Sequence, residues 1–527
     1  MNSYQDSLPS LKNAVPPEAF GYNISMYSVA LEGWRRGLTL KFINENTAPA
    51  QTHYSLSNGE KEHFFTVARG DRVPKEAIKI CIHKDLTKEY LEKHNIPIPK
   101  GNVFTKASAD TEIIEYASNI LGYPVVIKPV NGTGGHGVIA NIRDEKEFVS
   151  ALEYVRYDLN YSDIIVERFF KGEDYRLYVI DNNVIGAFKK IPANVIGDGI
   201  RSIRELLQFK NGERDSIPAF HNRLIKVDKE TTRLLEEKGY TLDTVPKDGE
   251  QVFLKTKNNV SSGGDPIDVT DLLTDELKQI AIDACNAIPG LVQGGVDMIV
   301  DESLKNGVIL EVNSRPHITS HLFPMQGKGR DIPKAVIDYY FPETTNKKKE
   351  HAELFYFDFK NVLEAFRNGY AKEITIPNIP SGNMTATRFH MNAVKTEDFR
   401  IWVRSQARKL RINGYVKLLK DGRTSVVAIG SPDLINKFRN VLKQDSLKKH
   451  RVQNVVEKSW SKPVKVGFEL VENTNIVKKL NNESNSVKYR SLEENNKHLK
   501  KKYQQIINST SWKITKPLRG VGRLFKR

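Results

Sequence analysis

Residues 125–138 read VVIKPVNGTGGHGV, and the glycines in this stretch decide the fold. The segment GTGGHG, residues 132–137, is formally G-x-G-x-x-G, the fingerprint of dinucleotide-binding folds. In those folds the last glycine opens a helix. Here residues 138–142 read as a strand, and the next helix starts only after Asp144. The glycine loop therefore joins two strands, as a flap over a nucleotide would, and Lys128 at the end of the first strand can meet a phosphate.

Composition indicates a globular, multidomain chain. It has 527 residues, of which 39% are hydrophobic and 27% charged. Only two cysteines are present, Cys81 and Cys285, so a disulfide framework is not expected and a reducing compartment is. The first twenty residues lack the apolar core of a signal peptide, and no apolar run is long enough to span a membrane. We expect a cytoplasmic protein.

The net charge of +16 is concentrated at the C-terminal end. Residues 489–527 contain eleven Lys or Arg and two Glu, a balance of 11 − 2 = +9. Such a tail can meet nucleic acid, anionic lipid or an acidic partner, or it can simply be a solvated end. No nucleic-acid module is recognisable, so nucleic acid ranks below the other partners.

Periodicity divides the chain into an α/β (α+β) body and a smaller second domain. Residues 1–74 mix helices and strands, and residues 75–342 alternate short β-rich runs with helices. Residues 343–350 read as a linker. Residues 351–470 contain the order βαββαβ of a ferredoxin-like domain, residues 471–488 a polar linker, and residues 489–527 a basic helical tail.

Two apolar strands carry isolated oxygen ligands. Glu311 and Asn313 are two residues apart in GVILEVNSRP, so they share one face of a strand, while Leu310 and Val312 are predicted to point into the core. Asp297 in GVDMIV joins them if the two strands are neighbours. Two carboxylates and an amide oxygen suit Mg²⁺ bound together with nucleotide phosphates.

These stretches together resemble ATP-grasp ligases. From about residue 75 to 342 the chain is most similar to the ATP-grasp parts of cyanophycin synthetase and of bifunctional glutathione synthetases. The resemblance rests on HKDLTKEYLEKHNIPIPKG, YPVVIKPVNGTGGHGV, IVERFFKGEDYRLYVI, KKIPANVIGDGIRSIREL, SSGGDPIDVTD, GGVDMIV and ILEVNSRPHITSHLFP, in the order of the family.

The resemblance implies a role for each residue at a matching position. ATP would be held by Lys84, Lys128, the loop glycines Gly132, Gly134, Gly135 and Gly137, the adenine-side residues Glu167, Phe169 and Phe170, and Asp174 near the ribose. Two Mg²⁺ ions would be held by Asp297, Glu311 and Asn313. The catalytic cations would be Arg176, Lys190 and Arg315, and the acceptor loop Ser262, Gly263 and Gly264. His136, His317 and His321 are given surface or hydrogen-bonding roles, because this chemistry needs no histidine base.

The implied activity is carboxylate–amine ligation. A carboxylate takes the γ-phosphoryl group of ATP to become an acyl phosphate, which an amine then attacks. Both substrates stay unnamed, and an oligomer is compatible with the sequence. The Mur-ligase-like half of cyanophycin synthetase has no counterpart here, so the chain is not expected to make that polymer by itself. A second hypothesis is a non-catalytic nucleotide-binding scaffold in a polysaccharide assembly complex.

The second domain resembles acylphosphatases over about residues 384–470. Arg400 takes the position of that family's phosphate-binding arginine. The glycine-rich phosphate loop is replaced by residues 392–398, NAVKTED, and the water-orienting asparagine by Leu418. We therefore interpret the domain as a degenerate binding or scaffolding module.

The tail carries a short motif of its own. Residues 511–519, SWKITKPLR, resemble the closing motif of many bacterial polysaccharide-cluster proteins. With Leu524 and Phe525 among basic residues, the tail is predicted to attach the enzyme to the inner membrane face or to a polysaccharide-assembly partner, beside glycan-linked substrates.

Overall fold

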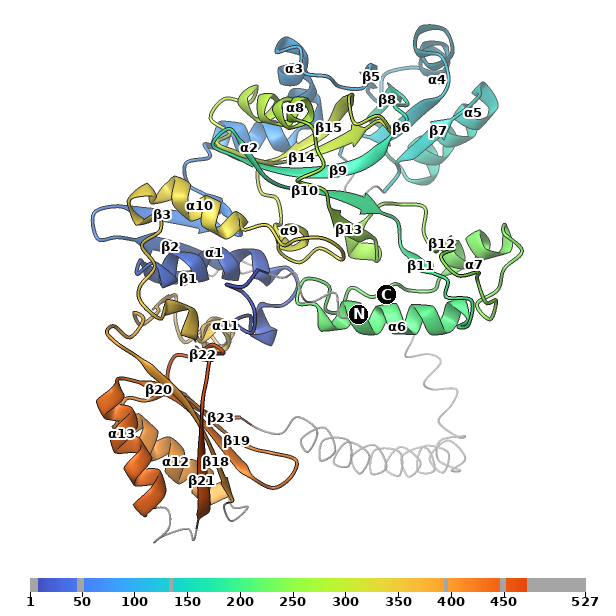
Figure 1. Cartoon of the computed structure of the whole chain (residues 1–527). Coiled ribbons are helices and arrows are strands. Elements are labelled where there is room, and N and C mark those ends of the chain that lie inside the picture. The colour runs from blue at the N-terminus through green and yellow to red at the C-terminus, as the bar shows by residue number, and fades with distance from the viewer. Residues whose placement is uncertain (1–7, 45–51, 132–135, 393–396, 446–451, 472–527) are drawn as a thin grey trace, which may run out of the picture. The chain divides into compact units, whose positions relative to one another are not determined.

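The computed structural model describes residues 8–44, 52–131, 136–392, 397–445 and 452–471. Contacts separate two compact units, coloured along the chain in Figure 1. The first comprises Met1–Asn383 and Lys462–Val466, and the second Met384–Ser461 and the chain from Gly467. The segment 343–350 lies inside the first unit, where Lys348 Nζ is 2.9 Å from Glu32 Oε2. No helix in the described part of the chain is long and apolar enough to cross a bilayer.

A five-stranded antiparallel sheet, here the central sheet, carries the predicted metal ligands and two of the three predicted catalytic cations. Its order is β13-β10-β9-β14-β15. The strands are β9 (Glu173–Ile180), β10 (Asn183–Ile191), β13 (Asp265–Asp268), β14 (Gln293–Val300) and β15 (Gly307–Asn313). One face packs on three helices, α2 (Lys75–Ile82), α3 (Lys84–Lys93) and α8 (Asp275–Asn286).

Alternation along the strands separates core from charge. Leu177, Val296 and Val312 are fully buried and join the core that contains Leu277 and Ala281 of α8. Because successive side chains of a strand point to opposite faces, the charged residues between them lie on the other face of the sheet. Burying the aliphatic side chains contributes about 1.5–3 kcal/mol each, which fixes the register that groups the charges.

A second antiparallel sheet of order β5-β8-β6-β7 contains the glycine loop. Its strands are β5 (Gly101–Phe104), β6 (Val125–Pro129), β7 (Ile139–Ile142) and β8 (Ile164–Arg168), and its helices are α4 (Asp110–Glu115) and α5 (Glu145–Glu153). The loop joins β6 to β7 as predicted, and the two strands pair directly. The helix α5 begins directly after Asp144, as predicted, and Asp144 caps it by accepting a hydrogen bond from the Glu147 backbone.

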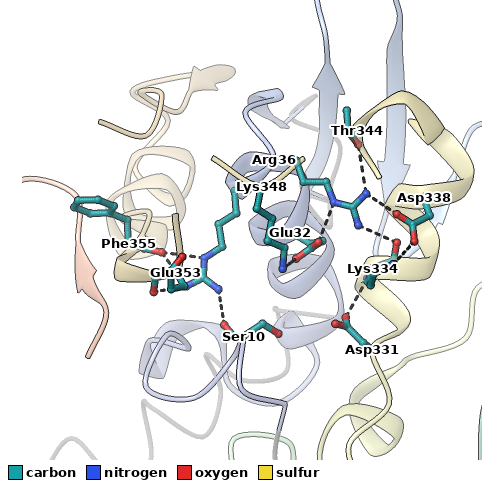
Figure 2. A network of polar contacts seen from close by, with 11 residues as sticks. Ser10, Glu32, Arg36, Asp331, Lys334, Asp338, Thr344, Lys348, Glu353 and Phe355 are labelled. Carbon is teal, nitrogen blue, oxygen red and sulfur yellow. Dashed lines mark hydrogen bonds and ion pairs between the residues drawn. The ribbon is translucent and has the colours of Figure 1, made fainter. Parts of the chain in front are cut away.

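The N-terminal region packs against a helix that follows the central sheet in the sequence. Its sheet has the order β17-β1-β2-β3-β4, and α1 packs against α10. These elements are α1 (Asn23–Arg35), β1 (Thr39–Asn44), β2 (Thr52–Ser57), β3 (Glu62–Thr66), β4 (Arg69–Gly70), α10 (Ile332–Tyr340) and β17 (Glu373–Thr375). Figure 2 shows the network that joins the two helices, in which Arg36 donates to Glu32 (2.9 Å) and to Asp338 (2.6 Å).

A smaller subdomain lies between β10 and β13 in the sequence. It contains β11 (Asn194–Ile196), α6 (Ile203–Ser216), α7 (Lys229–Glu236) and β12 (Gln251–Phe253), and it has its own apolar core. The remaining elements of the first unit are α9 (Thr319–Leu322), β16 (Phe355–Tyr356), α11 (Phe359–Arg367) and β22 (Val464–Lys465).

The second unit has the predicted βαββαβ order, with one added strand. Its sheet order is β21-β18-β20-β19-β23, and β23 pairs parallel to β19. The elements are β18 (Thr385–Asn392), α12 (Glu397–Lys409), β19 (Asn413–Leu418), β20 (Thr424–Gly430), α13 (Pro432–Asn440), β21 (Gln453–Ser459) and β23 (Phe468–Val471). Both helices pack on one face of this sheet through Phe399, Val403, Ile435 and Phe438.

Candidate active site

Three strands of the central sheet bring opposite charges into contact. Arg176 of β9 lies directly opposite Asp297 of β14, and it donates from Nε to Asp297 Oδ1 at 2.8 Å and from Nη2 to Oδ2. Lys190 of β10 donates to the same Oδ1 at 2.9 Å and lies 2.8 Å from Asp174 Oδ1. Two acids and two bases therefore form one array on the face opposite the core.

Because these four side chains lie close together and away from solvent, each shifts the pKa of its neighbours. Burial alone would raise the pKa of Asp297, but Arg176 and Lys190 outweigh it and hold that pKa well below its usual range. Burial would likewise lower the pKa values of Arg176 and Lys190, whereas attraction to Asp297 raises both. The pKa of Asp174 is raised, first by burial, against the opposing effect of Lys190. Asp297 is thus held as an anion.

Glu311 and Asn313 extend the array on β15. Glu311 lies directly opposite Asp297, and Asn313 lies opposite Gly295, two residues before Asp297 on β14. The Asn313 side-chain nitrogen is buried and has no hydrogen-bond partner. Since O and N of an amide are interchangeable in assignment, this group offers an unused polar ligand beside two carboxylates.

One expectation for this strand is wrong. Leu310 was predicted to point into the core, yet it is 37% exposed, whereas Ile309 is 1% exposed. The register shifts between Asp297 and Met298, whose partners are Glu311 and Ile309, so Leu310 is the extra residue of a β-bulge. A bulge breaks the two-residue alternation, which places Ile309 in the core and still leaves Glu311 beside Asp297.

The donor set of Asp297, Glu311 and Asn313 fits Mg²⁺, and the hydrogen bonds to Asp297 set a condition on how the metal binds. Two carboxylates and an amide are hard oxygen ligands, and Mg²⁺ usually keeps several waters or takes phosphate oxygens besides. Among the described residues, no three His, Cys, Asp or Glu side chains gather closely enough to hold a metal by themselves. Both oxygens of Asp297 are engaged by Arg176 and Lys190, so a metal would have to share this carboxylate with them.

The second sheet presents its own ion pair. Lys128 of β6 lies 2.6 Å from Glu167 of β8, with both side chains largely buried. Val126 is the direct partner of Glu167 across the two strands. Lys128, two residues further along β6, is therefore the diagonal neighbour of Glu167 on the same face of the sheet. Lys88 of α3 donates to the Gly101 carbonyl at 2.7 Å, and its pKa is lowered, first by burial, with Glu167 opposing and Lys128 adding to the effect. Lys88 was not predicted as a site residue.

The other predicted nucleotide contacts are distributed around this pair. Lys84 is the first residue of α3, one turn before Lys88, and is half-buried. The Phe169 amide donates to the Pro124 carbonyl at 3.0 Å, so only its carbonyl is left for an adenine amine. Phe170 is half-buried after β8. Asp174, assigned to the ribose, lies on the central sheet beside Lys190.

The glycine loop is described only at its end. Gly132, Gly134 and Gly135 lie outside the described residues. Gly137 has φ +75°, and a Cβ there would lie 2.7 Å from Pro129 Cγ, so both conformation and space require glycine. His136 bonds to the Tyr161 hydroxyl at 3.0 Å, in keeping with its predicted hydrogen-bonding role.

The predicted acceptor loop is anchored from α6. Ser262 is exposed, Gly263 has φ +107°, and Gly264 accepts a hydrogen bond from Arg214 at 3.2 Å. Arg214 is fully buried and also donates to Asp265 at 3.0 Å. This loop therefore has a fixed backbone.

Basic and histidine side chains surround the end of β15. Arg315 is exposed and, after burial, is the main cause that lowers the pKa of Arg69. Burial and then Arg223, Arg315 and Arg176 lower the pKa of His317 to about 4, so His317 is neutral at physiological pH. Arg69 and Arg223 were missed in the sequence, since isolated arginines look like surface charges.

His321 departs from its predicted role. It is 2% exposed, neither ring nitrogen has a partner, and burial lowers its pKa to about 3. Its ring instead packs edge-on against Phe188 at 4.7 Å. A surface or hydrogen-bonding role was wrong for this residue, because it follows β15 into the core.

The second unit contains the positions that the sequence compares with an acylphosphatase phosphate site. Arg400 is half-buried in the first turn of α12, and Leu418 ends β19. Residues 393–396, where the phosphate loop would lie, are outside the described part of the chain. The degenerate interpretation therefore stays a prediction based on sequence.

Comparisons with known proteins agree with this arrangement. A family model described as "ATP-grasp domain" matches residues 81–319. Residues 81–319 form an ATP-grasp domain. It belongs to the ATP-grasp carboxylate–amine ligase family, whose members use ATP and Mg²⁺, and a second model, acylphosphatase, matches residues 393–470. The predicted fold class and enzyme class are confirmed; the number of ions and the polysaccharide-type tail stay predictions.

Individual relatives match the ATP-grasp part of the chain. Cyanophycin synthetase from Trichormus variabilis is 35% identical over 272 residues, 50% of this chain and 30% of that protein. The glutathione biosynthesis bifunctional protein GshAB from Clostridium perfringens is 29% identical over 334 residues, 60% of this chain and 41% of that protein. The crystal structure of a bifunctional glutathione synthetase from Pasteurella multocida covers 55% of this chain and 40% of its own, with 27% identity and a TM-score of 0.44. The chain thus spans less than half the length of each.

Proposed function

We propose that this protein is an ATP-dependent carboxylate–amine ligase that acts through an acyl phosphate. The observation that carries the proposal is the array of Asp297, Glu311, Arg176 and Lys190 on one face of the central sheet. Buried, fixed charges of both signs are what phosphoryl transfer requires, because its catalysis is mainly positioning and neutralisation of charge.

We assign ATP to the two sheets. Lys84 and Lys128 hold its phosphates together with the loop glycines. Glu167 and the Phe169–Phe170 backbone hold adenine, and Asp174 the ribose. Lys128 is paired with Glu167 at 2.6 Å, so in this assignment the bound nucleotide competes for both partners of an existing ion pair.

We assign Mg²⁺ to Asp297, Glu311 and Asn313. The metal supplies charge neutralisation on the transferring phosphoryl group. Arg176, Lys190 and Arg315 orient and neutralise the same group from the protein side. Because Arg176 and Lys190 already keep Asp297 ionised, the carboxylate is ready as a ligand at neutral pH.

The proposed reaction has two chemical steps. A carboxylate oxygen attacks the γ-phosphorus of ATP and the bond to the β-phosphate bridging oxygen breaks, which gives an acyl phosphate and ADP. The amine then attacks the acyl carbon, the phosphate leaves, and the amine loses a proton to give an amide. The glycine flap excludes water that would hydrolyse the acyl phosphate.

The C-terminal tail bears on the substrates of the proposed ligase. We suggest an amino acid or similar amine joined to a cell-surface polysaccharide or peptide precursor, in the cytoplasm at the membrane face. The support is the tail motif SWKITKPLR and the basic charge around it, both outside the described residues.

The test is phosphate release by the full chain with ATP and Mg²⁺. The protein is incubated with a matrix of amino acids, uronic acids and amines, and inorganic phosphate is measured for each acid, each amine and each pair. The proposal predicts release that needs both an acid and an amine, and that Glu311→Gln abolishes. ATP binding without release from any pair would instead favour the nucleotide-binding scaffold.

A further inference from the structure

Three side chains far apart in the sequence stack beside the candidate active site. The Arg223 guanidinium lies 4.1 Å from the centre of the Tyr22 ring, and Tyr22 lies 4.8 Å from the His317 ring, centre to centre. Tyr22 precedes α1, Arg223 follows α6 and His317 follows β15. A cation over an aromatic face is attracted by the ring, so Tyr22 orients the guanidinium.

The stack has polar atoms that no protein group satisfies. Arg223 Nη2 and His317 Nδ1 are buried without a hydrogen-bond partner. Arg223 forms no ion pair with any side chain in the described ranges, and its pKa is lowered, first by burial, with only the Tyr22 ring opposing. A buried guanidinium nitrogen without an acceptor costs free energy unless a ligand supplies one.

Arg214 fixes this group next to the predicted acceptor loop. Its Nε donates to the Arg223 carbonyl at 3.2 Å, and its Nη groups donate to the Gly264 carbonyl at 3.2 Å and the Val260 carbonyl at 3.4 Å. A Cβ on Gly263 would lie 2.6 Å from Ile225 Cγ1, so the two loops are in direct contact. Arg223 therefore borders residues 260–264.

The stack of Arg223, Tyr22 and His317 also lies close to the charged array. Arg223, Arg315 and Arg176 all act on the pKa of His317, so His317 lies within electrostatic range of all three. The neutral imidazole adds no charge of its own, but its ring nitrogen can exchange a hydrogen bond with a bound group. The stack thus lies close both to the acceptor loop and to the residues assigned to phosphoryl transfer.

We infer that Arg223, Tyr22 and His317 form a subsite for a carboxylate carried by the amine substrate. The inference rests on the proposed ligase function and deepens it: the acceptor is an amino acid or peptide with a free carboxylate near its amine. A planar guanidinium fork matches a carboxylate with two parallel hydrogen bonds, which an ammonium cannot do. Anchoring the carboxylate here turns the amine toward the array.

Binding of matched probes to the full chain tests the subsite. The probes are the standard amino acids, each paired with its α-carboxamide, and inorganic phosphate, and dissociation constants are measured by calorimetry. At least one amino acid should bind more tightly than its carboxamide. Arg223→Gln should weaken that amino acid by roughly 10- to 100-fold and leave the carboxamide unchanged, because a hydrogen bond to a charged group is lost.

Three variants make the test specific. Arg233→Gln is the matched control, since Arg233 is 63% exposed and pairs with Glu237 on a helix surface, and it should bind as the wild type. Arg223→Lys keeps the charge without the fork and should restore little binding. Tyr22→Leu removes the ring at a position that is 58% exposed and should weaken the amino acid selectively, even if Arg223→Gln fails to fold.

The outcomes separate this inference from the proposed function. Equal binding of every amino acid and its carboxamide, or wild-type binding by Arg223→Gln, overturns the subsite. Arg223-dependent binding of phosphate in preference to every carboxylate overturns the carboxylate assignment. Discrimination that depends on Arg223, in a protein that never releases phosphate from ATP, supports the subsite and overturns the ligase.

Discussion

Asp297→Asn tests how far the charged array supports the domain. The wild-type side chain is 9% exposed and accepts two hydrogen bonds from Arg176 and one from Lys190. Asparagine keeps the shape but removes the charge. Removing one partner of a buried ion pair costs about 3–5 kcal/mol, and we expect about 3 kcal/mol, because Asn keeps an oxygen for Arg176 and Asp174 stays beside Lys190.

The assay is thermal unfolding of the full chain by calorimetry at neutral pH. The first unit has roughly 400 residues, and an unfolding entropy of about 2.1 cal/mol/K per residue makes each kcal/mol shift its Tm by roughly 1 °C. The transition of the first unit should therefore fall by about 3–4 °C. The control is Asp243→Asn, whose carboxylate is 75% exposed and pairs with Arg204. Exposed pairs contribute little, so that Tm should stay close to the wild type.

The loss of stability in Asp297→Asn should also depend on pH. The pKa of Asp297 is lower in the folded than in the unfolded chain, so its contribution to stability is present above the unfolded pKa, about 3.9, and is lost as the pH falls toward the folded pKa. The Tm difference between wild type and Asp297→Asn should therefore be constant above about pH 5 and shrink below about pH 4. An unchanged Tm in Asp297→Asn at neutral pH, or a difference that grows with acid, would refute the reasoning.

Four further predictions concern separate parts of the chain. Glu311→Gln should lower Mg²⁺-dependent turnover by about two orders of magnitude or more, measured across a Mg²⁺ titration, and full activity would place the metal elsewhere. Gly137→Ala should cost about 1–2 kcal/mol in thermal unfolding because of its positive φ, whereas Gly212→Ala, with open space in α6, should not destabilise. The full chain should not hydrolyse benzoyl phosphate above background, since Leu418 replaces the water-orienting asparagine; hydrolysis lost in Arg400→Ala would show a working acylphosphatase site. Truncation after residue 488 should reduce sedimentation with anionic liposomes and leave turnover of soluble substrates unchanged, and equal sedimentation would point to a protein partner.

The sequence was sufficient for features that repeat locally. The alternation in GVILEVNSRP predicted that Glu311 and Asn313 share a face, which Asp297 of GVDMIV would join if the two strands were neighbours. The strands are neighbours, and Asp297 and Glu311 are direct partners. The βαββαβ order predicted for this domain likewise rests on local signals: the amphipathic residues 397–409 form α12, and Asp421-Gly422 lies between the paired strands β19 and β20. Local periodicity fixes such elements because each buries one face.

The sequence was not sufficient where tertiary contacts decide. Leu310 fits the apolar alternation of the sequence, but in the structure it is the extra residue of a β-bulge. The bulge depends on the pairing register with β14, which the sequence of β15 alone does not contain. Ser431 precedes α13, where serine is a favoured cap, yet its side chain makes no capping hydrogen bond. Lys88, Arg69 and Arg223 had no pattern of their own, and only the packing of distant segments shows that they are half-buried beside the site.

The most direct test of the ligase follows one oxygen atom. The full chain is incubated with Mg²⁺, ATP and amines, and with amino and uronic acids whose carboxylates carry oxygen-18, and the released phosphate is analysed by mass spectrometry. An acyl phosphate route predicts phosphate that carries one labelled oxygen, together with an amide that has lost one, only when an amine is present. Release of unlabelled phosphate alone, with every acid and amine, would contradict it, because the γ-phosphoryl group would then have passed to water.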